Sequence, residues 1–270
     1  MIPAGYIAEW RQHVPWVASS QVEQDLVLSR VLIEIFGDRE LAASFAFRGG
    51  TALFKLYLTP APRYSEDIDL VQTRAEPIGA SLNRLRSRLD PWLGEPKRSF
   101  GEGRVTMVYR FASEDIEPLP LRLKVEINTR EHFSVFGFES RPFEMRSRWF
   151  SGQAAISTYT LDELLGTKLR ALYQRRKGRD LFDLWWAATH ATIDLDRVVA
   201  CFREYLEAEG LRVSRAELEA NLAGKLRDRL FTADLQPLLA PGTEWDPDRA
   251  ARLVLDEIAP RLPGDAWKGP

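Results

Sequence analysis

The segment Phe47–Leu70, FRGGTALFKLYLTPAPRYSEDIDL, limits what this chain can fold into more than any other part. Its two adjacent glycines allow a sharp turn whose backbone N–H groups can approach an anion. The apolar residues at 52–58 suit a short helix, which the two prolines that follow would end. Alternating acidic and apolar residues at 65–72 predict a strand. The segment therefore predicts a turn, a helix and a strand in close succession.

Asp67 and Asp69 are the strongest candidates for chemistry in this segment. Because side chains alternate along a strand, both carboxylates share one face while the apolar residues beside them enter the core. Gly49 and Gly50 would form a phosphate-binding turn, and Thr51 is expected to cap the helix and to add a hydroxyl donor. Two carboxylates beside such a turn predict a site for a divalent metal ion.

A second strand pattern, LRLKVEIN at residues 121–128, carries a further acidic candidate, Glu126. Apolar and polar side chains alternate along it, and a polar strand face is often only solvated. Alternatively, Glu126 lies opposite Asp67 and Asp69 as a third carboxylate. Such a set would suit two-metal phosphoryl chemistry, in which one ion activates the attacking hydroxyl and the other steadies the leaving pyrophosphate. The residues alone leave both interpretations open.

Composition narrows the class of protein. The chain has 270 residues with 45% apolar content, which predicts one or two domains with a true hydrophobic core. We expect a cytoplasmic protein with no membrane partner, because no apolar run approaches about 18 residues and the N-terminus lacks an export pattern. A single cysteine fits a reducing compartment. The net charge of −2 neither favours nor excludes nucleic acid.

The pattern changes near residue 150. Residues 1–150 mix helical and strand patterns, whereas 151–270, after a last strand candidate at 154–159, is mainly helical. We therefore predict an α+β fold with two domains. Capping boxes, in which Ser or Thr precedes Glu by three residues, mark several helix starts. These starts are Ser20 with Glu23, Thr160 with Glu163, Ser214 with Glu217, and an N-cap at Asp246 followed by proline.

Lys168 lies among leucines on the predicted helix that begins near Thr160. A lysine in such a position either extends outward to solvent or ends in a cleft that holds an anion, and the second reading fits the predicted phosphate turn. Asp180 follows on the next helix, directly after Arg179. Structural pairing with that arginine and a role in catalysis are both open.

The stretch from Lys168 to Arg179 is the densest positive patch in the sequence, with six basic residues and no acidic one. Beside an active site it would attract a nucleotide or a nucleic-acid backbone. The alternative is a solvated helix end, where cations are favoured by the helix dipole. The candidate nucleic-acid contacts are Arg175, Arg176, Lys177 and Arg179.

Four motifs, taken in this order, carry a family resemblance. They are GGTAL, RYSEDIDL, KVEIN, and Lys168 followed by RRKGRDLFDLWW. Together they resemble the AbiEii family of nucleotidyltransferase toxins, which includes the MenT group and belongs to the polymerase-β-like nucleotidyltransferase superfamily. The resemblance covers residues 45–187. Fifteen residues separate Thr51 from Asp67, more than is usual in that superfamily but similar to the toxin family.

The resemblance implies a nucleotidyltransferase-like N-terminal domain with a small mixed sheet, followed by a helical domain that contributes basic residues. It implies an enzyme that uses Mg²⁺, expected as two ions, to transfer a nucleotide from an NTP to the 3′ acceptor end of tRNA. It also implies an AbiEi-type antitoxin partner. The residue roles carried over are phosphate binding by Gly49, Gly50, Thr51, Ser65 and Lys168, metal binding by Asp67, Asp69 and Glu126, and a catalytic position for Asp180.

Two other functions remain open at this level. A nucleotidyltransferase could act on a small molecule or a protein, as antibiotic-modifying and AMPylating enzymes do, because the catalytic core would be shared and only the acceptor site would differ. A non-catalytic binding module fits less well, since every expected metal ligand is present in the sequence.

Overall fold

The computed structural model describes residues 2–115 and 117–269. The described residues divide into two compact units, one ending at Tyr159 and the other beginning at Thr160. The first unit contains all the strands of the described residues, and the second is helical. The strand β7 (Ser151–Tyr159) belongs to the first unit, nine residues beyond the point where the sequence pattern changes.

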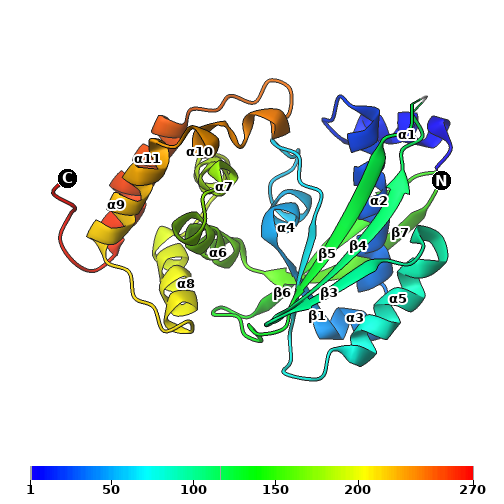
Figure 1. The fold of residues 1–270 in the computed structure, drawn as a ribbon, viewed down its shortest axis with the longest axis horizontal. Coiled ribbons are helices and arrows are strands. Elements are labelled where there is room, and N and C mark those ends of the chain that lie inside the picture. Colours follow the sequence, from blue (N-terminus) through cyan, green and yellow to red (C-terminus); the bar gives the residue numbers. More distant parts are fainter. Residues whose placement is uncertain (1, 116, 270) are drawn as a thin grey trace. The chain divides into compact units, whose positions relative to one another are not determined.

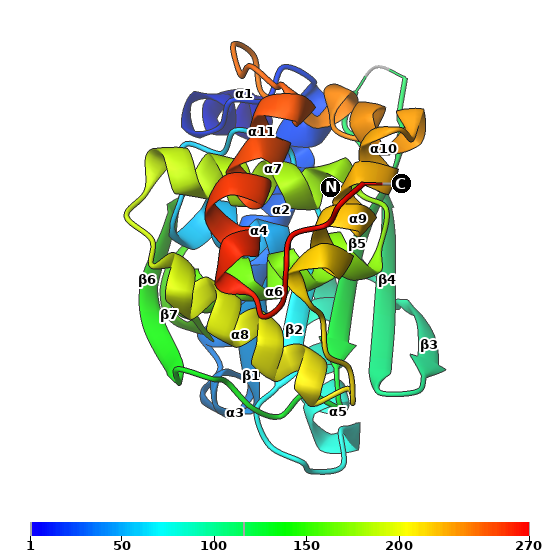
Figure 2. The same cartoon turned by 90° about the vertical axis from the view of Figure 1, so that its left-hand side faces the viewer.

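A seven-stranded mixed sheet forms the centre of the first unit, in the order β3-β4-β5-β2-β1-β7-β6. The remaining strands are β1 (Phe45–Arg48), β2 (Ile68–Gln72), β3 (Lys97–Gly101), β4 (Arg104–Ala112), β5 (Pro120–Asn128) and β6 (Phe138–Arg146). Figure 2 shows β3 and β6 at opposite edges of the sheet. The two central strands β1 and β2 are antiparallel, whereas β2 with β5 and β1 with β7 are parallel. The predicted α+β fold with a mixed sheet is confirmed.

Two layers of helices flank this sheet (Figure 1). The helices α2 (Ser19–Phe36) and α5 (Gly79–Leu93) cover one face, and the short helix α4 (Gly49–Leu56) lies against β1 and β2 on the other. The helices α1 (Ala4–Trp10) and α3 (Arg39–Ser44) pack against α2. Alternate residues of β4 and β5, such as Met107 and Val125, are fully buried on the side of α2 and α5.

The start of α2 differs from the predicted capping box. Its N-cap is Ala18, which makes no side-chain cap. Glu23 is buried instead, and its carboxylate accepts a hydrogen bond from the backbone N–H of Glu114, 91 positions along the chain. The box at Ser20 is therefore wrong, because a tertiary contact takes the glutamate away from the helix terminus.

The second unit is built from α6 (Leu161–Gln174), α7 (Gly178–His190), α8 (Leu195–Glu207), α9 (Arg215–Leu226), α10 (Arg229–Ala233) and α11 (Pro247–Leu253). The helix α6 packs against α7 and α8, and α7 packs against α11. Thr160, Ser214 and Asp246 each cap a helix with a side-chain oxygen, and the full reciprocal box is present at Ser214. None of the helices in the described residues is long and apolar enough to cross a membrane.

Candidate active site

The two aspartates lie where β2 begins. The strand starts at Ile68, so Asp67 directly precedes it and Asp69 is its second residue. This strand is shorter than the predicted 65–72. The Asp67 carbonyl oxygen accepts a hydrogen bond of 2.6 Å from the hydroxyl of Thr51. The chain before β2 is therefore held by a side chain and not by a neighbouring strand.

Gly49 permits the close approach of Asp69 to the start of α4. Its φ of +84° is a left-handed conformation that residues with a Cβ rarely adopt. A Cβ at this position would lie 2.3 Å from the Oδ2 atom of Asp69. Arg48, the preceding residue, pairs in register with Asp69 on the neighbouring strand. The glycine thus lets a carboxylate pack directly against the backbone at the turn from β1 into α4.

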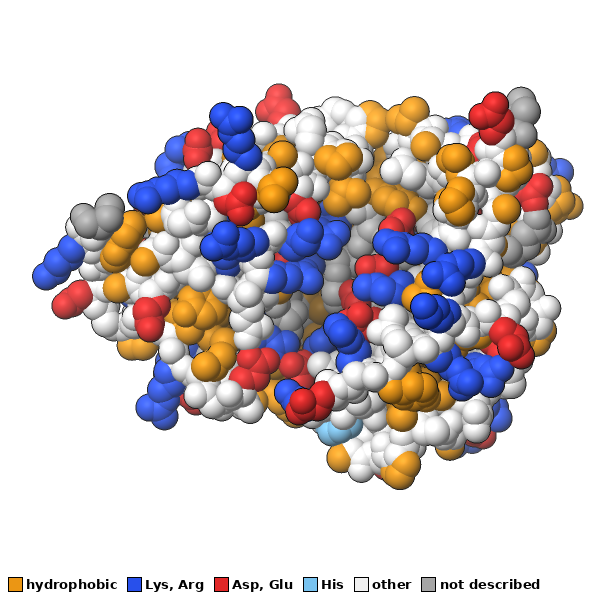
Figure 3. Space-filling view, in the orientation of Figure 1, with side chains coloured by type: hydrophobic (Ala, Val, Ile, Leu, Met, Phe, Trp, Pro, Cys, Tyr) orange, Lys and Arg blue, Asp and Glu red, His pale blue; other side chains and the backbone are white. Residues whose placement is uncertain are grey.

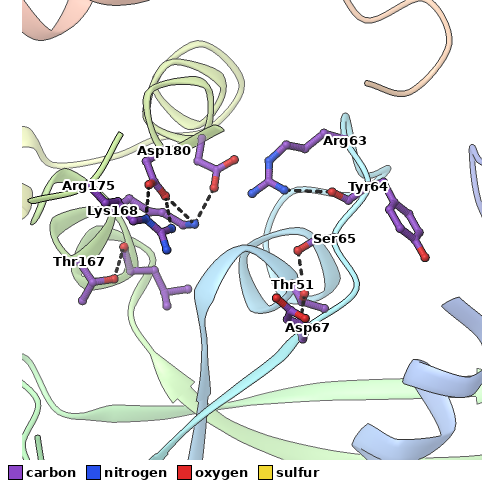
Figure 4. A network of polar contacts seen from close by, with 11 residues as sticks. Thr51, Arg63, Tyr64, Ser65, Asp67, Thr167, Lys168, Arg175 and Asp180 are labelled. Carbon is purple, nitrogen blue, oxygen red and sulfur yellow. Dashed lines mark hydrogen bonds and ion pairs between the residues drawn. The ribbon is translucent and has the colours of Figure 1, made fainter. Parts of the chain in front are cut away.

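Thr51 does not cap the helix, contrary to the sequence-based prediction, because α4 already begins at Gly49. Its hydroxyl lies 2.8 Å from the hydroxyl of Ser65 and donates to the Asp67 carbonyl, as Figure 4 shows for the labelled residues. The Thr51 side chain is buried, whereas Ser65 is half-buried. This contact ties the first turn of α4 to the segment that carries the aspartates.

Arg63 lies at the same turn and was not predicted as a site residue. A Cβ on Gly50 would lie 2.5 Å from its Nη2 atom, so the guanidinium rests on the backbone of α4. The side chain is 2% exposed, donates to the Tyr64 carbonyl at 3.0 Å, and stacks over the Phe54 ring at 4.8 Å. A buried, fixed guanidinium beside a glycine turn is well suited to bind phosphate oxygens.

A cavity of about 100 Å³ opens beside these groups. Its lining includes the hydroxyls of Thr51 and Ser65 and the cationic side chains of Lys55 and Arg63. Lys55 is held 2.8 Å from both carboxylate oxygens of Asp25. Hydroxyl donors and a guanidinium at one end of a cavity are a suitable setting for an anionic group.

The carboxylates sit in a mixed electrostatic environment. Burial raises the pKa of Asp69, and the nearby Asp67 raises it further, while Arg48 and Lys124 oppose the shift. The Nζ atom of Lys124 lies 3.0 Å from Asp67 Oδ2. Partial burial lowers the pKa of Lys124, but the ion pair with Asp67 outweighs it, so the pKa of this lysine is raised. The pair of aspartates therefore attracts positive charge.

Glu126 pairs in register with Asp69 on β5, so it lies on the same face of the sheet. Its nearest cations are Lys124 at 3.6 Å and Arg104 at 3.9 Å. Within residues 2–115 and 117–269, no group of three or more His, Cys, Asp or Glu side chains is arranged to hold a metal ion. Lys124 contacts both Asp67 and Glu126, and the role of Glu126 as a third metal ligand stays a prediction.

The two aspartates by themselves fit Mg²⁺. In phosphate-transferring sites this ion is commonly held by one or two carboxylates, and substrate phosphates and water complete its shell. Burial, and after it the charge of Asp67, raises the pKa of Asp69, and a divalent cation bound to this carboxylate would offset both effects.

In the second unit, Lys168 lies between two buried carboxylates. Its Nζ atom is 3.3 Å from Asp180 Oδ1 and 2.8 Å from Asp183 Oδ2, and the lysine side chain is 8% exposed. Asp180 also accepts two hydrogen bonds from Arg175, at 2.7 and 2.8 Å, which Figure 4 shows together with Lys168. Asp180 thus fixes the position of two cations, one from α6 and one from the loop that follows it.

The basic run at the end of α6 is largely paired. Arg175 binds Asp180, Arg176 lies 3.6 Å from Asp228, and Lys177 lies 3.3 Å from Asp234. Both of these partner aspartates come from a later part of the chain. Arg179 is half-buried and forms no ion pair among the described residues. Most of the positive charge that the sequence concentrates here is already balanced.

A family model described as "Nucleotidyl transferase AbiEii toxin, Type IV TA system" matches residues 30–253. The chain belongs to the AbiEii family. The matched range covers most of each unit and includes Gly49, Asp67, Asp69, Lys168 and Asp180. As a member of the AbiEii family, this chain is a nucleotidyltransferase of a type IV toxin–antitoxin system. The predicted resemblance is confirmed.

Solved structures share the fold of this AbiEii protein. It is similar to MenT4, a nucleotidyltransferase toxin from Mycobacterium tuberculosis, with 17% identity, a TM-score of 0.67, and coverage of 97% of this chain and 91% of that one. It is also similar to JHP933 from Helicobacter pylori, with 17% identity, a TM-score of 0.54, and coverage of 91% and 92%. No curated protein sequence matches the chain.

Two residues of this AbiEii chain, Arg63 and Lys124, lie at the candidate site without having been predicted there. Arg63 is the first residue of the RYSEDIDL motif, four residues before Asp67, and its place in that motif was the signal for it. Lys124 alternates in phase with Glu126 on β5, which placed it on the polar face without showing that it reaches Asp67. Both were missed because each depends on contacts between separate elements.

Proposed function

We propose that this AbiEii protein transfers a nucleotide from an NTP to the 3′ end of tRNA in a Mg²⁺-dependent reaction that blocks translation. The observation that carries the proposal is the juxtaposition of Asp67 and Asp69 with the Gly49–Thr51 turn. A phosphate-binding turn and a carboxylate pair together meet the needs of phosphoryl transfer, which are positioning and charge stabilisation.

The triphosphate would lie at the start of α4. The hydroxyls of Thr51 and Ser65 and the guanidinium of Arg63 supply hydrogen-bond donors, and Gly50 leaves room for that guanidinium beside the helix start. Arg63 is already buried, so little side-chain entropy is lost when it binds an anion. These groups would fix the α-phosphate for in-line attack by a 3′-hydroxyl, with pyrophosphate as the leaving group.

Asp67 and Asp69 would hold the Mg²⁺ ions. When bound, Mg²⁺ lowers the pKa of the attacking hydroxyl and stabilises charge on the leaving pyrophosphate. Lys124 neutralises Asp67 when no ion is present and would have to release that carboxylate to the metal. Glu126 is placed to receive Lys124 at that moment, since its Oε2 atom is already 3.6 Å from the lysine. In this proposal Glu126 assists metal binding through Lys124.

Lys168 and Asp180, both on the second unit, are proposed to act in phosphate binding and in catalysis. Lys168 is assigned to the nucleotide phosphates from the family motif, and Asp180 with Asp183 positions its ammonium group. The basic residues Arg176 and Arg179 remain candidates for contact with the acceptor. The same resemblance supports an AbiEi-type antitoxin as the partner and the cytoplasm as the place of action.

The proposal is tested with the full-length protein, Mg²⁺, total tRNA and each of the four α-labelled NTPs in turn. Label should appear in tRNA on a denaturing gel, and mass spectrometry should locate it at the 3′ end. tRNA whose terminal ribose has been oxidised with periodate should accept nothing. The Asp69→Asn protein serves as the matched inactive control.

The same assay separates the competing acceptors. Label incorporated into lysate protein or into a small molecule, with none in tRNA, would replace the tRNA assignment while leaving nucleotidyl transfer intact. Incorporation that persists after periodate oxidation would contradict attack by a 3′-hydroxyl.

A further inference from the structure

The face of β3, β4 and β5 opposite α2 and α5 is strongly basic. Between β4 and β5, Arg110 is paired with Arg122, Val108 with Lys124, and Arg104 with Asn128. Between β3 and β4, Lys97 is paired with Val108. Paired residues share a sheet face, so five cations lie together on it. We call this set the basic face: Lys97, Arg104, Arg110, Arg122 and Lys124. Figure 3 shows Lys and Arg side chains gathered over β4 and β5.

The basic face is accessible and poorly neutralised. Lys97, Arg110 and Arg122 are exposed and form no ion pair among the described residues. Glu126 is the only acidic residue on this face of the three strands. The whole chain carries a formal net charge of −2, so this concentration of positive charge is local. Such a patch attracts polyanions.

The pairing of Arg110 with Arg122 is expected to destabilise the sheet. Residues directly opposite each other on antiparallel strands have closely spaced Cβ atoms, and like charges in such pairs destabilise the sheet. An anion that binds both arginines would therefore reduce their repulsion and stabilise the sheet. Residues that weaken a fold in this way are commonly found where function requires them.

The basic face is continuous with the carboxylate pair. Glu126 pairs with Asp69, and Lys124 contacts Asp67, so the cations begin directly beside the two aspartates. Arg122 is four residues from Glu126 on β5, which corresponds to about 14 Å, or the rise of about four base pairs. An RNA strand whose 3′ end lies at Asp67 and Asp69 would thus reach Arg110 and Arg122 within a few nucleotides.

We infer that the open face of β3, β4 and β5 binds the phosphate backbone of the acceptor RNA and leads its 3′ end to Asp67 and Asp69. This inference rests on the proposed function. It shifts the main RNA contact away from the basic run after α6, whose members Arg175, Arg176 and Lys177 are already paired with aspartates. On the basic face, Lys97, Arg110 and Arg122 have no such partner among the described residues.

The test measures binding of a fluorescent RNA hairpin with a short single-stranded 3′ tail across a range of KCl concentrations. The double variant Arg110→Gln/Arg122→Gln should bind on the order of 10-fold more weakly per arginine, and its salt slope should fall by about 2. The matched control is Arg212→Gln/Arg252→Gln, which removes the same charge from exposed sites of the second unit. This control should retain wild-type affinity.

Two further measurements make the result decisive. NTP binding by calorimetry should match the wild type in the Arg110→Gln/Arg122→Gln protein, and its melting temperature should equal or exceed the wild-type value. An unchanged affinity and salt slope would overturn the inference, as would an equal loss in the control. Wild-type protein that binds the hairpin in a salt-dependent manner but transfers no nucleotide would overturn the proposed function instead, so the two failures are distinguishable.

Discussion

Replacement of Gly49 with alanine tests the geometry of the carboxylate pair. An added Cβ would lie 2.3 Å from Asp69 Oδ2, whereas ordinary contacts begin at 3.4 Å. The carboxylate would therefore have to move by about 1 Å, and a misplacement of that size lowers catalytic rates on the order of 100-fold. The positive φ of +84° adds a backbone cost of about 1–3 kcal/mol to the folded state.

Gly94→Ala supplies the matched control. Gly94 has a similar φ of +78°, but a Cβ there would meet nothing within 4 Å. Both variants should lose about 1–3 kcal/mol of unfolding free energy in a denaturant titration, because both force alanine to a positive φ that residues with a Cβ rarely adopt. Only Gly49→Ala should lose activity, measured as single-turnover transfer of labelled nucleotide to RNA at saturating Mg²⁺.

The comparison separates strain from displacement of the carboxylate. If Gly49→Ala retained transfer within a few-fold of the wild type, the packing of Asp69 against the turn would not matter for the reaction. If Gly94→Ala lost as much transfer activity as Gly49→Ala, general destabilisation of the fold would explain the loss in both variants. Either result would refute the reasoning.

Four other substitutions have distinct expected outcomes. Asp69→Ala should abolish transfer without lowering the melting temperature, because it removes repulsion between neighbouring carboxylates, and full activity with Mg²⁺ would exclude this residue as a ligand. Asp180→Asn should cost about 3 kcal/mol in denaturant unfolding because it removes a fully buried negative charge shared by the buried Lys168 and by Arg175. Arg175→Ala, at a half-exposed site, should cost about 1 kcal/mol or less. Burial raises the pKa of Glu23 from 4.5 to about 7, so folding stability should fall as pH rises through that window. Glu23→Gln should remove this slope, worth at most about 3 kcal/mol, and an unchanged slope between pH 5 and pH 8 would contradict it.

The local structure around the site was largely predictable. Adjacent glycines, an apolar helix, two prolines and an alternating strand are features whose conformation depends on neighbours within a few residues. The helix starts at Ser214 and Asp246 were predictable for the same reason, since a cap involves only the next three residues. Where a distant group competes, as the backbone of Glu114 does for Glu23, the local rule fails.

The family motif placed Asp67, Asp69 and Ser65, but it did not show their contacts. The hydroxyl of Thr51 was expected at a helix terminus and instead joins Ser65 to the chain before β2. Arg63 reaches Gly50 because the segment after α4 folds back over that helix. These contacts span about a dozen residues or more, and their geometry follows from packing.

The sequence by itself determined the types of charge in this protein and the local elements that carry them. Only the tertiary structure decided which cations are already neutralised. Arg176 and Lys177 are bound by aspartates more than 50 positions later in the chain, whereas Arg110 and Arg122 are brought together by a strand ladder. The physical reason is that an ion pair forms wherever packing brings two side chains within about 4 Å, and sequence periodicity fixes distances only within one element.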